Sequence, residues 1–106
     1  MSATDKERIE DILEFSETVT AIVSEGQDKF YSNKVSQLAL ERLIISIGEV
    51  CSKITSDFQY AHSEIPWRDI IGMRNLLIHA YHRIEISQVW KAATEDIPNL
   101  VRSITN

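Results

Sequence analysis

Arg74, Asn75 and His79 stand close together in a segment that is otherwise rich in apolar residues. A fixed arginine can bind a phosphate and stabilise the negative charge that develops on it during a reaction. A neutral imidazole can take the proton of a hydroxyl group near physiological pH. These residue types are therefore suited to cleaving a phosphodiester bond beside a ribose 2′-hydroxyl, a reaction that requires no metal ion. Taken alone, a histidine in such a position is more often a satisfied or solvated side chain than a catalytic one.

The spacing of the apolar residues predicts a helix over residues 66–82 that positions this pair, with Pro66 in its first turn. Arg74 and Tyr81, seven residues apart, fall within about 20° of each other inside the apolar sector of this helix. Arg74 and His79 are separated by about 140° around the axis and by about 7.5 Å along it. One copy of the pair therefore does not converge on a common spot, and a second subunit could complete the site.

Arg74 needs an anionic partner or a wet cleft, because an unpaired guanidinium among apolar residues is costly to desolvate. Glu49 is the candidate partner, since it too lies among apolar neighbours, in a predicted helix over residues 33–55. Arg42 lies on the same stripe and competes for the carboxylate. A structural ion pair and a catalytic one are equally compatible with this pattern.

The run from Ile65 to Tyr81 resembles the signature of HepT-type HEPN proteins. In that signature four residues separate an arginine from a histidine, an asparagine follows the arginine, and a tyrosine stands two residues after the histidine. Arg74, Asn75, His79 and Tyr81 fill these four positions without a gap. Weaker likeness is spread over most of the chain, at residues 11–13, 30, 47–49, 89–90 and 95–100. Ala80 and His82 depart from the residues common in such proteins, but neither is a motif position.

The resemblance implies a metal-independent endoribonuclease that acts as a toxin, with RNA as substrate and no cofactor. Arg74 and His79 would be catalytic, and Asn75 and Glu49 would support them. Tyr81 would be adenylylated by a small nucleotidyltransferase antitoxin, which would silence the enzyme. The HEPN pattern also implies a symmetric homodimer whose motif helices share a cleft. Leu76, predicted to face away from the apolar sector, would lie in that interface.

Apolar periodicity and capping signals predict an all-α fold, an antiparallel four-helix bundle of the HEPN-like kind. The predicted helices span residues 4–24, 33–55, 66–82 and 87–104, with a loop over 25–32 and a polar connection over 56–65. Thr4 and Ser87 are the expected caps of the first and last helices, and Ser32 or Asn33 can cap the second. Pro98 should kink or restart the last helix. The second helix is apolar almost all round and should be central. Gly48 in its interior indicates a close approach by another backbone.

Length and composition favour one domain over residues 1–106, with 43% hydrophobic and 25% charged residues. The chain shows neither a signal peptide nor an apolar run of membrane-spanning length, so we expect a cytoplasmic protein without membrane contact. Cys51, the single cysteine, should be a core thiol. The formal charge of −5 arises within residues 1–31, whereas residues 66–83 carry more basic than acidic residues. RNA contact should therefore centre on residues 66–83.

Two other classes of function remain open. The same bundle could be a non-catalytic helical binding subunit of a nucleotidyltransferase, with a cleft that only holds nucleotide. Alternatively, His79, His82 and Glu85 could bind a metal ion, although their spacing drifts around a helix and no further ligand is evident.

Overall fold

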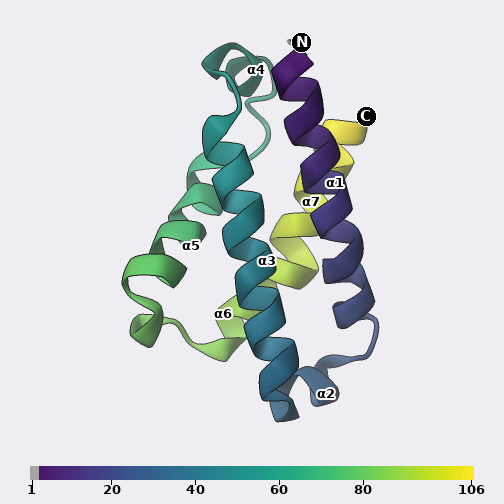
Figure 1. Ribbon diagram of the computed structural model, residues 1–106, viewed down its shortest axis with the longest axis vertical. Helices are drawn as coiled ribbons and strands as arrows, with labels where there is room; N and C mark the ends of the chain where they lie inside the picture. The colour runs from purple at the N-terminus through teal and green to yellow at the C-terminus, as the bar shows by residue number, and fades with distance from the viewer. Residues whose placement is uncertain (1–2) are drawn as a thin grey trace.

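A computed structural model describes the backbone of residues 3–106 and the side chains of these residues except Ala3 and Tyr81. Its elements in chain order are α1 (Ala3–Val23), α2 (Gln27–Ser32), α3 (Lys34–Lys53), α4 (Ser56–Ala61), α5 (Trp67–His79), η1 (Tyr81–Arg83), α6 (Ile86–Lys91), η2 (Ala92–Asp96) and α7 (Ile97–Thr105) (Figure 1). Residues 3–106 contain no β-strand, so the all-α prediction is confirmed. None of the described helices is long and apolar enough to cross a bilayer.

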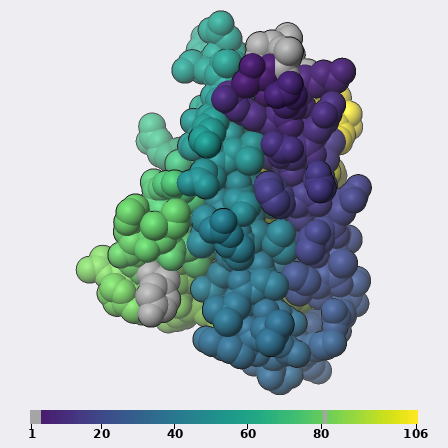
Figure 2. All heavy atoms as spheres, viewed as in Figure 1, coloured from purple at the N-terminus to yellow at the C-terminus, as the bar shows by residue number. Residues whose placement is uncertain are grey.

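Helix α3 is central, as its apolar periphery predicts, and lies between α1 and α5 (Figures 1 and 2). Its N-terminus forms where expected, because the Asn33 side chain accepts a hydrogen bond from the Ser36 amide at 3.0 Å. The buried face of α3 supplies Leu40, Ile44, Ile47 and Cys51 to the core. Cys51 is a core thiol, as predicted, and burial raises its pKa to about 12.

Two segments predicted as irregular contain short helices instead. Helix α2 occupies most of residues 25–32 and starts after Gly26, whose φ of 97° is a left-handed conformation favoured by glycine. Its Phe30 is buried against Trp90, with ring centroids 5.0 Å apart. Helix α4 lies within residues 56–65 and is capped by Thr55, which accepts from the Phe58 amide. The simple four-helix bundle is therefore not confirmed.

Residues 86–105 form one helical run that changes type along its length. Glu85, rather than the predicted Ser87, precedes its first turn, and the Gln88 side chain accepts from the Glu85 amide at 2.9 Å. A π-helical turn, η2, precedes α7, whose first turn contains Pro98. Proline lacks the amide that would continue the α-helical ladder. The prediction that Pro98 restarts the helix agrees with this change.

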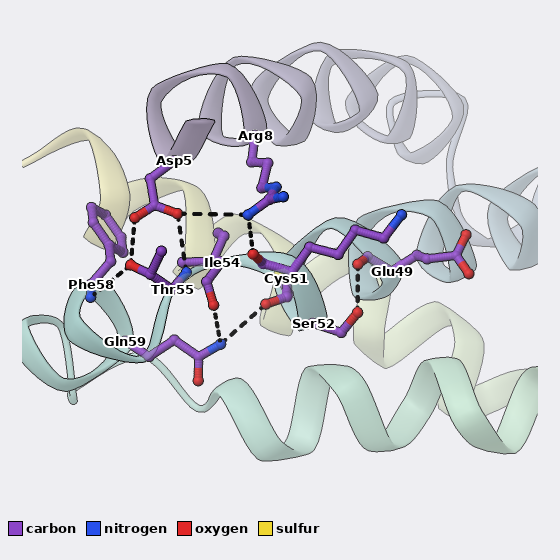
Figure 3. A network of polar contacts seen from close by, with 10 residues as sticks. Asp5, Arg8, Glu49, Cys51, Ser52, Ile54, Thr55, Phe58 and Gln59 are labelled. Carbon is purple, nitrogen blue, oxygen red and sulfur yellow. Dashed lines mark hydrogen bonds and ion pairs between the residues drawn. The ribbon is translucent and has the colours of Figure 1, made fainter. Parts of the chain in front are cut away.

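The predicted cap at Thr4 is wrong, because α1 already includes Ala3 and Thr4. Asp5 instead carries the polar contact at this end of α1. Its carboxylate, 1% exposed, accepts from the Thr55 amide at 3.0 Å and from Thr55 Oγ1 at 2.5 Å (Figure 3). Arg8 adds an ion pair with Asp5 and a bond to the Lys53 carbonyl. These contacts fasten the start of α1 to the end of α3.

We expect Asp5→Asn to lower the free energy of unfolding by ~1–3 kcal/mol. The substitution replaces one carboxylate oxygen with an NH2 group, which cannot accept the hydrogen bond that Thr55 donates there. Urea unfolding followed by circular dichroism measures this loss. Asp11→Asn is the matched control, since Asp11 is exposed on the same helix. Equal stability of the two variants would show that the Asp5–Thr55 contact does not stabilise the fold.

Candidate active site

Arg74 lies on α5 where this helix packs against α3. A side-chain carbon built on Gly48 of α3 would lie 2.4 Å from Arg74 Cβ and 3.3 Å from the Ile70 carbonyl oxygen. Real side-chain carbons do not approach that closely, so only glycine fits without moving a helix. The predicted close approach at Gly48 is confirmed, and the stem of Arg74 occupies the space.

The Arg74 guanidinium is held between two side-chain oxygens. Nη2 donates to Glu49 Oε1 at 2.7 Å, and Nη1 donates to Asn75 Oδ1 at 2.7 Å. This confirms Glu49 as the anionic partner predicted from the sequence. The hydrogen bond and the charge of Arg74 hold the pKa of Glu49 below its usual value. Both interactions orient the planar group before any ligand binds.

One nitrogen of the guanidinium has no hydrogen-bond partner among the described residues. Arg74 Nε is buried and makes no hydrogen bond within the described part of the chain. The Arg74 side chain as a whole is 24% exposed, so the guanidinium borders solvent without being surrounded by it. A cation in this position keeps donor capacity that a bound anion could use.

His79 is the last residue of α5 and is exposed. The structure therefore places it on the same helix as Arg74 and Asn75, as predicted. Among the described contacts, no hydrogen bond or ion pair joins His79 to the Arg74–Glu49–Asn75 cluster. The cluster and the imidazole are separate groups in one protomer, which agrees with their predicted angular separation.

The predicted continuation of the motif helix to His82 is wrong. Helix α5 ends at His79, Ala80 leaves helical geometry with φ −146° and ψ 37°, and residues 81–83 form a 3-10 turn. The wheel relation that put Tyr81 within about 20° of Arg74 assumes an unbroken helix and is therefore void. The side chain of Tyr81 lies outside the described residues, so its predicted modification stays a prediction.

His79, His82 and Glu85 do not form the metal site weighed above. Within the described residues, no group of three or more histidine, cysteine or acidic side chains is arranged to hold a metal ion.

Comparison with known proteins gives this geometry a context. The family model of HepT-like ribonucleases matches residues 6–106. The chain belongs to the HepT-like ribonuclease family. A probable ribonuclease HepT of Thermococcus cleftensis is 39% identical over 101 residues, 94% of this chain and 92% of the relative. A putative RNase of Methanocaldococcus jannaschii is 31% identical over 98 residues, 92% of this chain and 84% of its own. No solved structure matches the chain.

Sequence reasoning missed a cavity that this HepT-like chain forms beside the site. Lys34, Gln37 and Glu41 of α3 line it together with His82. The available signal was the set of polar residues on an α3 that is otherwise apolar. The pattern could not show which segment they face, because the end of α5 at His79, after which η1 and α6 line the cavity, was not predicted.

We expect Gly48→Ala to lower the free energy of unfolding by ~1–3 kcal/mol, because the added methyl group displaces Arg74 and overpacks the α3–α5 contact. Thermal and urea unfolding measure the loss. Gly72→Ala is the matched control on α5, since a side-chain carbon there meets nothing within 4 Å. That variant should be as stable as the parent or gain up to ~1 kcal/mol from helix propensity. A neutral Gly48→Ala would refute the steric argument.

Proposed function

We propose that this chain is a metal-independent endoribonuclease that uses Arg74 and His79, and that adenylylation of Tyr81 silences it. The observation that carries the proposal is the Arg74 guanidinium, oriented by Glu49 and Asn75 five residues before an exposed His79. Its occurrence in a HepT-like ribonuclease supports RNA as the substrate.

In the proposed reaction, His79 takes the proton of a ribose 2′-hydroxyl. The 2′-oxygen then attacks the adjacent phosphorus, and the bond from phosphorus to the 5′-oxygen of the next nucleotide breaks. The departing 5′-oxygen takes a proton from an acid such as a second imidazolium or water. Arg74 donates to the phosphate oxygens, on which negative charge builds up during the attack. All the acid-base and electrostatic roles can thus be filled by side chains.

Glu49 and Asn75 act as positioning residues in this scheme. A guanidinium donates through a rigid planar fork, so two fixed acceptors, one on each terminal nitrogen, leave its remaining donors aimed in a defined direction. Preorganised charge stabilises a transition state better than charge that must reorient during the reaction. The Arg74–Glu49 pair is therefore more than a structural ion pair in this proposal.

We further propose that two protomers share the site. Leu76 and Ile78 of α5 are 42% and 41% exposed, and they flank the part of the helix that carries His79. A second copy covering these side chains would bring its own His79 towards Arg74 of the first. The exposed apolar side chains on α5 and the separation of Arg74 from His79 within one protomer both support a site shared by two protomers.

Regulation by a nucleotidyltransferase partner completes the proposal. Tyr81 follows His79 by two residues, so an adenylate on its hydroxyl would add negative charge and bulk close in the chain to the proposed general base. That charge would repel the RNA phosphate. The cytoplasm, where RNA and nucleotides are abundant, is the expected place of action.

Arg74→Ala and His79→Ala should each reduce RNA cleavage by ~10²-fold or more, because charge stabilisation and general acid-base catalysis each contribute about that much. Cleavage of a labelled RNA by purified protein in EDTA measures the loss, and growth inhibition on expression should disappear with it. Circular dichroism controls for folding. Cleavage by the parent that vanishes in EDTA would refute metal independence. Nucleotide binding without any cleavage would favour the non-catalytic binding subunit.

Mixing the two inactive variants tests the shared site. If one protomer supplies Arg74 and the other His79, unfolding and refolding the mixture should restore part of the activity in mixed dimers. Light scattering should show a dimer at micromolar concentration for all three proteins. A monomeric, fully active parent would exclude the shared site and leave each protomer complete.

Tyr81→Phe should remain toxic and escape neutralisation by the nucleotidyltransferase, since it keeps the ring and removes the hydroxyl that accepts adenylate. Intact mass of the co-expressed parent should increase by whole adenylate groups, whereas the variant should not change. Tyr60→Phe is the matched control, because Tyr60 is 87% exposed on α4, away from the motif. A Tyr81→Phe variant that is still neutralised, with an unmodified parent, contradicts this regulation.

A further inference from the structure

The cavity beside the proposed catalytic site has a volume of about 390 Å³. One wall is the N-terminal half of α3, and the other is η1 and the start of α6. Leu38, Ile84, Ile86 and Val89 supply apolar surface, and Leu38 is 54% exposed. Apolar side chains facing each other across a space of this size suit a flat, weakly hydrated ring.

The cavity continues the face of α3 that holds Arg74. On a helical wheel Lys34, Glu41, Gly48 and Glu49 fall within one sector about 100° wide. Gly48 contacts Arg74, and Glu41 lies seven residues earlier, about 10 Å along the axis. His79 and His82 come after Arg74 in the chain, at the end of α5 and in η1, and His82 also lines the cavity. An RNA strand that places a phosphate on Arg74 can therefore place a neighbouring base here.

Two polar side chains of the cavity, Gln37 and Glu41, offer acceptors. The Gln37 side chain donates through Nε2 to the Phe30 and Tyr31 carbonyl oxygens, at 3.1 and 3.2 Å. Those two bonds use both donors of the amide and leave its carbonyl oxygen as an acceptor. Glu41 adds a carboxylate, and Lys34 supplies a cation for a backbone phosphate.

We propose that this cavity binds the base next to the cleaved RNA bond and selects guanine, an inference that rests on the proposed ribonuclease activity. Guanine presents two adjacent donors, N1–H and the N2 amino group, which one carboxylate can accept together. Uracil offers a single donor there, N3–H, between two carbonyl oxygens that Glu41 would repel. Adenine and cytosine offer one amino group each and fall between the two.

Cutting of a random-sequence RNA pool, followed by sequencing of the product ends, tests the selection. The parent should show guanine on one side of the cut enriched on the order of tenfold or more over uracil, the discrimination expected of a bidentate contact. Glu41→Gln should lose this enrichment, because an amide cannot accept both donors. Glu14→Gln, an exposed site on α1 with the same change of charge, should keep it. A parent that cuts without preference for guanine, or a Glu41→Gln variant that keeps the preference, overturns the proposal.

Binding separates this inference from the proposed activity. Fluorescence anisotropy with the His79→Ala variant should show tighter binding of a guanine-containing hexanucleotide than of its uracil counterpart, and adding Glu41→Gln should abolish the difference. Lys34→Ala should weaken both RNAs alike and reduce the salt dependence by about one charge. Guanine preference in binding without cleavage by the parent would sink the ribonuclease proposal alone. Cleavage without guanine preference in either assay would sink the base pocket alone.

Discussion

The packing of the Arg74 stem against Gly48 is the constraint on which the rest of the structure depends. It lets a long cationic side chain pass between two helices that could not otherwise approach so closely. A guanidinium placed there is partly desolvated, so it requires a nearby carboxylate, and the next residue of α3, Glu49, supplies it at 2.7 Å. The same contact fixes how far α5 slides along α3. It thereby determines which α3 side chains face the η1–α6 segment beyond the end of α5.

The elements that sequence could predict are those whose signals are local. Helix α3 has both a strong apolar pattern and the Asn33 cap, and its limits were nearly right. Glu49 could be paired with Arg74 because both are charged residues on apolar stripes. Helices α2 and α4 are six residues each, too short for periodicity to appear. They are stabilised by side chains outside them instead. Phe30 of α2 packs on Trp90, and Trp67 Nε1 donates to the His62 carbonyl oxygen at 3.1 Å just after α4.

The end of α5 shows the opposite failure, in which a local pattern continues but the helix does not. Residues 80–82 contain neither glycine nor proline, so nothing in the sequence predicts a break at Ala80. The chain must nevertheless turn for Val89 of α6 to reach the core, where it is 1% exposed. Tertiary packing therefore overrides helix propensity. Because the helix breaks between Arg74 and Tyr81, the relation between the two cannot be derived from a helical wheel.

An acidic chain can serve as an RNA-binding protein only if its charges are segregated, and the fold achieves this. Eight of the sixteen acidic residues precede residue 32, most of them on α1. Figures 1 and 2 show α3 between α1 and α5, so the width of a helix separates the acidic face from the proposed site. A helix with its side chains is about 10 Å across, and the Debye length in physiological salt is about 8 Å. Repulsion from α1 is thus largely screened at α5. Within residues 66–83, Arg68, Arg74 and Arg83 outnumber the one acidic residue, Asp69. The net charge of −5 alone argues against a nucleic-acid substrate. The placement of the N-terminal acidic residues, most of them on α1, removes that objection.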